Sequence, residues 1–472
     1  MSKSSRAQVT VPVNILWLVA GRVSGDACLL IFYVALSRLF GQVGIGHYAF
    51  AMSLTGIFAY FADFGLHRFS VRTWPRSSDE FPSRLGEVLA LRLVLMPIVG
   101  CLLLLFAEAL GLDGQQRLVV FVVGLHQILF TLADGLLAAF VAHQESRISS
   151  LLDLSGKVLT VVVGMVLIMA GADLPIVLVA MPLSTVCLLI IAALTVHRRY
   201  GTPVFTLNLA AGIRTATAAW PSFLSVSARQ ISIRTDVVLL GLLMGPAAAG
   251  IYSVGQRVVW MLVSIPGMAA VGILPRASIL HLKDKERLSA FYSRSVNLAI
   301  LLGVPAAAGI FLVAADIIDV IFGPEFTQAV PVLRILSLYL LLSVLRNVGS
   351  AFLSASDLEG ARARVEWTGA ALGLGFQLLL IPLYGVVGAA IAVVLMEAST
   401  TLIVGFLVTA QLGLPRIMHR LLMASLGSMA FSLAWLSIGR PPLYFAVPLA
   451  VAVYVGFLMT SRSIRREDFS IT

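Results

Sequence analysis

Seven basic side chains stand inside apolar stretches of this sequence, where charge is costly. They are Arg22, Arg92, Lys157, Arg229, Arg234, Arg257 and Arg346. A basic residue at the centre of a membrane helix costs roughly 2.5–3.5 kcal/mol, and such residues usually face a helix-bundle interior or a water-filled cavity. A guanidinium also presents paired N–H donors that match phosphate oxygens. The sequence therefore indicates a buried site for an anion.

Acidic neighbours along the chain distinguish some of these residues. Arg92 lies two turns from the end of its apolar segment, so we expect its side chain to extend toward the membrane interface. Lys157 follows Asp153 by four residues, and Arg22 precedes Asp26 by the same spacing. Either pair could be a structural salt bridge along its own helix. Arg22 lies deeper, however, and a place in a cavity is the alternative.

The remaining four arginines are less easily explained by local pairing. Arg229 and Arg234 are about 140° apart around a helix, so both cannot face one narrow cleft. One of the two could instead pair with Asp236 or with another helix. Arg257 and Arg346 have no acid within one helical turn, which favours positions in a cavity. The predicted anion-binding residues are Arg22, Arg229, Arg234, Arg257 and Arg346.

The acids at similar depth are fewer than the bases. They are Asp26, Asp63, Asp134, Asp153, Asp236 and Glu397. We expect Asp63 and Asp134 to be solvated near helix ends, which leaves a net positive interior. The candidates for ion coupling are Asp26, Asp236 and Glu397. No H-x-x-x-H, C-x-x-C, G-x-S-x-G or P-loop pattern occurs, so we expect no metal, no cofactor and no hydrolase chemistry.

The elements that must position these charges are membrane helices. Of the 472 residues, 59% are hydrophobic and 12% are charged, too few charges for a soluble chain of this length. A spanning helix needs about 20 mostly apolar residues, and membrane strands would instead alternate. Fourteen spans are predicted near 14–38, 46–66, 86–107, 118–142, 150–170, 174–196, 216–243, 248–274, 295–315, 329–354, 366–382, 385–410, 420–438 and 443–460.

Loop charges predict the orientation. Alternate loops hold 22 Lys and Arg residues when counted from the amino-terminal end, and the opposite loops hold 4. By the positive-inside rule both termini are cytoplasmic. The basic residues of the cytoplasmic loops account for most of the net charge of +10, so the charge requires no nucleic-acid partner. We expect the first apolar segment to be a retained helix and not a cleaved signal peptide.

An internal repeat organises the helices. FGQVGIGHYAFA begins at Phe40 and MGPAAAGIYSVG begins at Met244, and both contain G-x4-G-x-Y, with an offset of 204 residues. A tight turn alone could explain either copy. The matched pair predicts two six-helix lobes with the same orientation, related by an axis along the membrane normal, with a cleft between them. The predicted domains are 1–205 (helices 1–6), 206–412 (helices 7–12) and 413–472 (two extra helices and a tail).

Four stretches carry a family resemblance that runs over essentially the whole chain: 36–72, 234–258, 321–366 and 378–398. In order along the chain they resemble the polysaccharide transporter family, the Wzx-like oligosaccharide flippases. This family belongs to the multidrug/oligosaccharidyl-lipid/polysaccharide exporter superfamily. The resemblance implies two six-helix lobes, often with two extra helices, that work by alternating access. It also implies export of undecaprenyl-pyrophosphate-linked oligosaccharides for O-antigen, capsule or exopolysaccharide.

The sequence hypothesis is therefore an inner-membrane flippase and not an enzyme. Its expected partners are the lipid-linked oligosaccharide, membrane lipids, a polysaccharide polymerase and a chain-length regulator. A lipid II flippase and a multidrug exporter are the transport alternatives, although a positive cavity disfavours cationic drugs. A glycan ligase or polymerase is the enzymatic alternative. Such an enzyme would be expected to carry a large outer loop, and no predicted outer loop exceeds about 15 residues.

Overall fold

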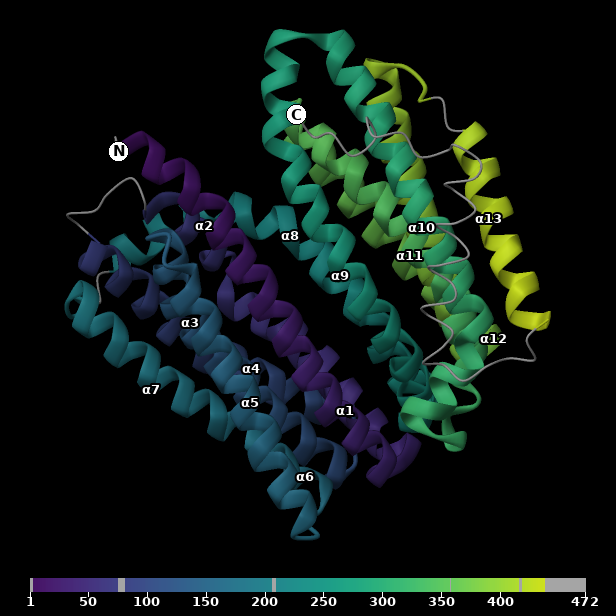
Figure 1. Ribbon diagram of the computed structural model, residues 1–472. Helices are drawn as coiled ribbons and strands as arrows, with labels where there is room; N and C mark the ends of the chain where they lie inside the picture. The colour runs from purple at the N-terminus through teal and green to yellow at the C-terminus, as the bar shows by residue number, and fades with distance from the viewer. Residues whose placement is uncertain (1–2, 75–80, 206–208, 357, 416–417, 438–472) are drawn as a thin grey trace. The chain divides into compact units, whose positions relative to one another are not determined.

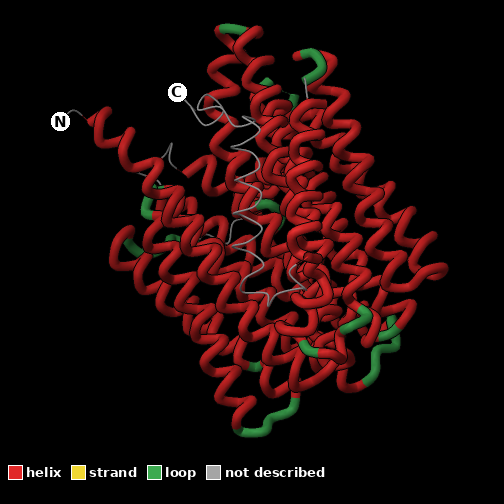
Figure 2. The backbone as a smooth tube through the Cα atoms, turned by 45° about the vertical axis from the view of Figure 1, so that its right-hand side comes forward, coloured by secondary structure: helices red, strands yellow, loops and turns green. Residues whose placement is uncertain are grey.

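The computed structural model describes residues 3–74, 81–205, 209–356, 358–415 and 418–437. Within these ranges every regular element is a helix and no strand occurs (Figure 2). The helices are long and apolar because a chain crossing hydrocarbon must satisfy its backbone hydrogen bonds internally. The predicted all-α membrane fold is confirmed.

Backbone contacts divide the chain into two compact units, Met1–Gly241 and Leu242–Thr472. The division falls near the end of helix α8 (Leu209–Met244), so this helix packs with the first unit. The sequence repeat instead assigns α8 to the second lobe. The predicted boundary between 205 and 206 therefore describes the repeat, and it differs from the division made by contacts.

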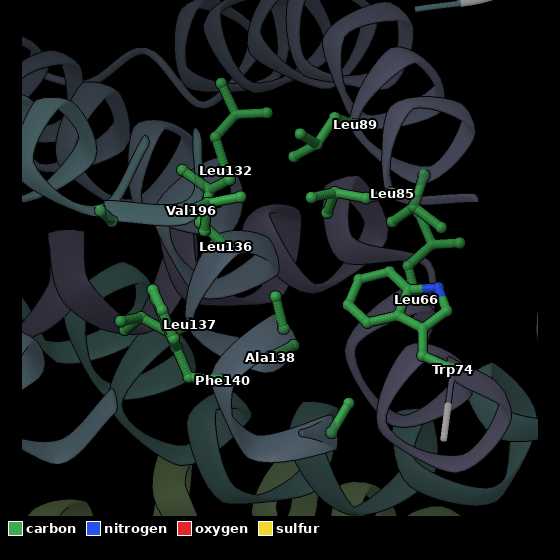
Figure 3. Close-up of a cluster of buried hydrophobic side chains, with 14 of the residues drawn as sticks. Leu66, Trp74, Leu85, Leu89, Leu132, Leu136, Leu137, Ala138, Phe140 and Val196 are labelled. Atoms are coloured by element: carbon green, nitrogen blue, oxygen red, sulfur yellow. The ribbon is translucent and has the colours of Figure 1, made fainter. Parts of the chain in front are cut away.

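The first unit contains seven further helices, drawn from purple to teal in Figure 1. They are α1 (Lys3–Asp63), α2 (Leu66–Thr73), α3 (Phe81–Ala109), α4 (Gly114–Ala142), α5 (Ser146–Met169), α6 (Leu174–Leu178) and α7 (Ala180–Tyr200). Helix α4 is central, since it packs against α1, α3, α5 and α7, and α1 also packs along α5. A hydrophobic core gathers around α3, α4 and the short α2 (Figure 3).

The second unit has its own helices and core. They are α9 (Pro246–Lys283), α10 (Lys285–Phe322), the 3₁₀ turn η2 (Pro324–Phe326), α11 (Ala329–Ala355), α12 (Glu359–Leu412) and α13 (Met418–Ser437). Helix α11 lies among α9, α10 and α12, while α13 packs on α10. This arrangement makes α11 the most enclosed helix of the unit.

Thirteen of the fourteen predicted spans coincide with helices of the described residues. In the part of the chain that the structure describes, eight helices are long and apolar enough to cross a membrane. Two of these, Leu16–Asp63 with 48 residues and Gly360–Leu412 with 53, are long enough for two spans each, because one crossing needs about 20 residues. The fourteenth predicted span, 443–460, lies outside the described residues.

The repeated glycine motif has the same backbone conformation in both copies. Gly41 divides α1 with φ 63° and ψ −165°, and Gly245 begins α9 with φ 87° and ψ 174°. This region of conformational space is essentially restricted to glycine. The repeated tyrosines, Tyr48 and Tyr252, are buried. The motif is therefore a turn between two helices, and its tyrosine packs inside the protein.

Candidate functional site

A chain of four charges joins α1 to α5 in the first unit. Arg22 and Asp26 lie one turn apart on α1, with Nε and Oδ2 3.9 Å apart. Lys157 Nζ of α5 lies 3.7 Å from Asp26 Oδ1 and 2.9 Å from Asp153 Oδ2. Both salt bridges predicted along single helices are therefore present. The structure adds a link that the sequence analysis did not foresee, because Lys157 also reaches Asp26 on the other helix.

Arg22 is the most available member of this chain. Its side chain is 71% exposed, against 37% for Asp26 and 21% for Lys157. The 3.9 Å separation from Asp26 is longer than a hydrogen bond, so the pair is only loosely held. An arginine this exposed on an apolar helix needs an aqueous or anionic environment. Arg22 can therefore offer its guanidinium N–H donors to a phosphate.

Two glycines place α1 close enough to α5 for this contact. A Cβ on Gly21 would lie 2.6 Å from Ser150 Cβ, and a Cβ on Gly25 would lie 2.6 Å from Lys157 Cδ. Since real Cβ atoms do not approach that closely, the Gly21–Gly25 spacing serves close helix packing within the unit. The missing side chain at Gly25 leaves the space through which Lys157 reaches Asp26.

Helix α8 carries two more predicted anion contacts with different surroundings. Arg229 is half-buried. Arg234 donates from Nη1 to the backbone oxygen of Met52 at 2.9 Å, and Gly56 leaves room for its guanidinium. Asp236 is buried and interacts electrostatically with Arg234. Arg234 thus ties α8 to the second half of α1.

In the second unit, Arg346 has no acid within one turn of its own helix but has two acidic partners on another helix. Its Nε donates to Glu397 Oε1 at 2.7 Å, and its Nη1 donates to Glu366 Oε1 at 3.0 Å, both on α12. Its Nη2 also donates to Asn347 Oδ1 at 3.2 Å. Spacing along one helix could not reveal these partners, and the predicted role of Arg346 as an anion contact stays a prediction. Arg257 on α9 is half-buried, and its predicted role as an anion contact stays a prediction.

Arg92 corrects an expectation, because its side chain is fully buried and does not extend to an interface. It donates to the backbone oxygen of Thr131 and forms an ion pair with Asp63. Beside this pair, His67 Nδ1 lies 2.7 Å from Asp134 Oδ2. Asp63 and Asp134, expected to be solvated, thus belong to one polar cluster. Three consecutive apolar segments with a charge near the same end were the signal that could have revealed it.

A cavity of about 370 Å³ lies apart from these charges, between α3 and α4. Its lining is apolar and includes Leu93, Pro97, Phe121 and Leu125. It has no cation that could bind an anion, so it is not a candidate for the predicted site. The described residues contain no cluster of His, Cys, Asp and Glu that could hold a metal ion.

Parts of the sequence are similar to known membrane and biosynthesis proteins. A 238-residue stretch is 30% identical to Probable flippase AglR of Haloferax volcanii, covering 48% of this chain and 50% of the relative. A second stretch, of 169 residues, is 30% identical to Probable low-salt glycan biosynthesis flippase Agl15 of the same organism, and it covers 36% of this chain and 36% of the relative. Teichuronic acid biosynthesis protein TuaB of Bacillus subtilis is 27% identical over 34% of this chain and 33% of its own length. These matches span half or less of the relatives.

Solved structures share the fold over nearly the whole chain. The lipid II flippase MurJ, in an inward closed conformation, matches with a TM-score of 0.80 at 12% identity, covering 95% of this chain and 99% of that one. An inward-facing multidrug MATE transporter matches with a TM-score of 0.67 at 15% identity, covering 84% and 94%. The model of the polysaccharide biosynthesis protein family matches residues 12–281, more than half of the sequence. The chain therefore belongs to the polysaccharide biosynthesis protein family, as a multi-pass membrane protein with the fold of MurJ-like and MATE-like transporters.

Proposed function

We propose that this protein is a flippase that moves undecaprenyl-pyrophosphate-linked oligosaccharide repeat units across the cytoplasmic membrane by alternating access. The family and the named flippase relatives support transport of a glycan precursor. The single structural observation that carries the substrate proposal is Arg22, a highly exposed guanidinium on an apolar helix. A pyrophosphate is the part of such a substrate that costs most to move through hydrocarbon.

Arg22 lowers that cost by replacing water around the phosphate oxygens. A charge moved out of water loses its hydration unless it is paired and hydrogen-bonded. Hydrogen bonds to a charged group contribute about 1.5–3 kcal/mol each, and a guanidinium can make two in parallel. Its loose pairing with Asp26 means that little must be broken before Arg22 can bind.

Asp26 can promote release of the bound substrate. Its carboxylate lies 3.9 Å from Arg22 and 3.7 Å from Lys157, so it competes with a bound anion for both cations. The four-charge chain is neutral when it is empty, and the bound pyrophosphate makes it negative. Return of Arg22 and Lys157 to Asp26 then favours release. Asp26 is also the coupling-ion candidate nearest to this step, with Asp236 and Glu397 as the others.

The other predicted arginines have distinct places in this proposal. Arg229 and Arg257 are further contacts for the anion. Arg234 and Arg346 hold helices together through Met52 and the two α12 glutamates, and they become substrate contacts only if those bonds open. The proposed setting is a bacterial inner membrane with both termini cytoplasmic. A polysaccharide polymerase and a chain-length regulator are the proposed partners downstream.

The test uses a strain whose surface glycan depends on this protein. Arg22→Ala should lower glycan export roughly ten- to a hundredfold, the range for one lost hydrogen bond to a charged group, and lipid-linked precursor should accumulate. Arg22→Lys should retain part of the activity. The matched control is Arg287→Ala, which removes an exposed arginine paired with Asp284 on α10. Export by Arg22→Ala equal to that of the control, at equal protein level, would remove Arg22 from the mechanism.

The identity of the accumulated precursor separates the alternatives. Build-up of lipid II in place of a polysaccharide repeat unit would identify a lipid II flippase, a reading favoured by the shared fold with MurJ. Drug resistance on overexpression, without precursor build-up, would identify an exporter of drugs. If loss of this protein instead left repeat units on the outer side of the membrane, transported but not polymerised, the protein would be a ligase or polymerase.

A further inference from the structure

The end of α1 carries a break that brings charged residues together. Asp63 is the last residue of α1, and α2 begins at residue 66. Between them Phe64 has φ 50° and Gly65 has φ 70°, both in the left-handed region. For Phe64 this conformation costs about 1–3 kcal/mol. It is held by Phe223, whose ring stacks on that of Phe64 with centroids 4.9 Å apart, so the break is a fixed feature of the unit.

Near this break, four ionisable groups from four helices lie close together. Arg92 of α3 bonds to the backbone oxygen of Thr131 and to the carboxylate of Asp63. Asp63 also accepts the backbone N–H of His67 at 3.3 Å, within the first turn of α2. His67 Nδ1 lies 2.7 Å from Asp134 Oδ2 of α4. Asp63 from α1, Arg92 from α3 and Asp134 from α4 are therefore the charged groups that face His67.

The charges of this cluster balance only when it holds one extra proton. Two carboxylates, Asp63 and Asp134, face one permanent cation, Arg92. With a neutral His67 imidazole the cluster carries one negative charge, and with a protonated imidazole it carries none. Burial of an uncompensated charge is unfavourable, so the surroundings favour the protonated form.

The cluster shares its helices with the hydrophobic core, and its members differ in exposure. Four core side chains lie within three residues of a cluster member and are labelled in Figure 3: Leu66, Leu89, Leu132 and Leu136. Side-chain exposure rises from 0% at Arg92 through 16% at Asp63 and 30% at Asp134 to 39% at His67. A proton can therefore reach His67 from outside the core, while Arg92 fixes the interior end.

We infer that Asp63, His67, Arg92 and Asp134 form a proton-binding site in which the imidazole of His67 carries the proton and the Asp134 carboxylate stabilises it. The inference is independent of the cargo and uses none of the acids proposed above for ion coupling. Occupation of the site holds α2 against α4. Loss of the proton leaves an unbalanced carboxylate between them and weakens that contact.

The direction of the titration agrees with this geometry. Burial by itself lowers the pKa of His67, but the carboxylates of Asp134 and Asp63 outweigh burial and raise the pKa above its ordinary value. A nearby opposite charge typically moves a pKa by about one to three units. The size of the change on removing one carboxylate is therefore large enough to measure directly.

The experiment follows the His67 imidazole in the full chain, reconstituted in lipid nanodiscs, by NMR of ¹⁵N-labelled histidine side chains during a pH titration. His67→Gln assigns the resonance. The expected pKa is above the ordinary value of about 6.5, and Asp134→Asn should lower it by about one to three units. The matched control Asp284→Asn removes a partly exposed carboxylate of the second unit and should leave the pKa of His67 unchanged.

A second variant guards against misfolding. Asp63→Asn leaves Arg92 facing His67 without its acid and should also lower the pKa of His67. The resonance of His126, which contacts Thr185 within the same unit at 2.7 Å, reports whether each variant is folded. A wild-type pKa at or below 6.5, or an unchanged pKa in a folded Asp134→Asn or Asp63→Asn variant, would overturn the inference. Neither result would bear on Arg22 or on the proposed cargo.

Discussion

Replacing Arg346 by methionine should leave two glutamates facing each other inside the second unit. Glu397 is fully buried, and Glu366 is 16% exposed, so neither can regain full hydration when the guanidinium is removed. Both belong to α12, one on each side of the break at Gly385, and both are held by α11 through Arg346. The substitution therefore acts on the packing between these two helices.

The expected cost follows from the burial of the group. Removing one partner of a buried ion pair costs about 3–5 kcal/mol, because the remaining charge is unpaired. In a unit of this size each kcal/mol lowers the melting temperature by about 2–4 °C, so a fall of roughly 6–20 °C is expected. Replacing both glutamates by glutamine in the Arg346→Met background removes the stranded charges and should recover most of that loss.

Thermal unfolding of the purified full chain in detergent, at equal concentration, measures these differences. Arg287→Met is the control, since Arg287 is 81% exposed and its pair with Asp284 lies at the surface. Exposed pairs often contribute nothing measurable. An Arg346→Met protein as stable as this control, or a triple variant no more stable than Arg346→Met, would show that the carboxylates do not depend on the guanidinium.

Three further substitutions test other parts of the structure. Gly65→Ala should lower the melting temperature markedly, because the residue has φ 70° and its Cβ would lie 2.6 Å from the backbone nitrogen of Phe223; wild-type stability would contradict this close contact. Gly21→Val should weaken glycan export at normal expression by separating α1 from Ser150, with Gly212→Val, whose Cβ meets no atom within 4 Å, as control. The raised pKa of His67 contributes stability that is fully present below about pH 6.5 and is lost as pH rises through the folded-state pKa, so melting temperatures between about pH 5 and pH 9 should fall less steeply in His67→Gln. An identical slope in the two proteins would show that His67 is not linked to folding.

Much of the helical architecture could be predicted from the sequence, because the signal is strong and local. An apolar run of about 20 residues has few folded alternatives in a membrane. The turn at Gly41 and its repeat at Gly245 could also be found, since only glycine tolerates their backbone conformation. The turns at Gly41 and Gly385 divide α1 and α12 into two spans each, as hydropathy predicts, but the angle between the two spans of a helix cannot be predicted from apolar length.

Charge pairing was predicted only where both partners share a helix. Arg22 with Asp26, and Lys157 with Asp153, follow from four-residue spacing and are present. Partners on different helices depend on which faces meet, and spacing along one chain segment does not determine that. Glu366, a partner of Arg346, lies at the first position of a predicted apolar span, where sequence gives no sign of its depth or its partner.

Arg22 and Arg346 show why the identity of a buried residue does not determine its role. Both are arginines in apolar helices, and both were predicted to contact an anion. Arg346 has side-chain acceptors on three of its nitrogens and is almost fully buried, so an incoming phosphate would have to displace two carboxylates. Arg22 is 71% exposed and has one loose partner among the described residues. An anion therefore meets a much smaller barrier at Arg22, and substrate binding should depend on this arginine more than on any better-paired one.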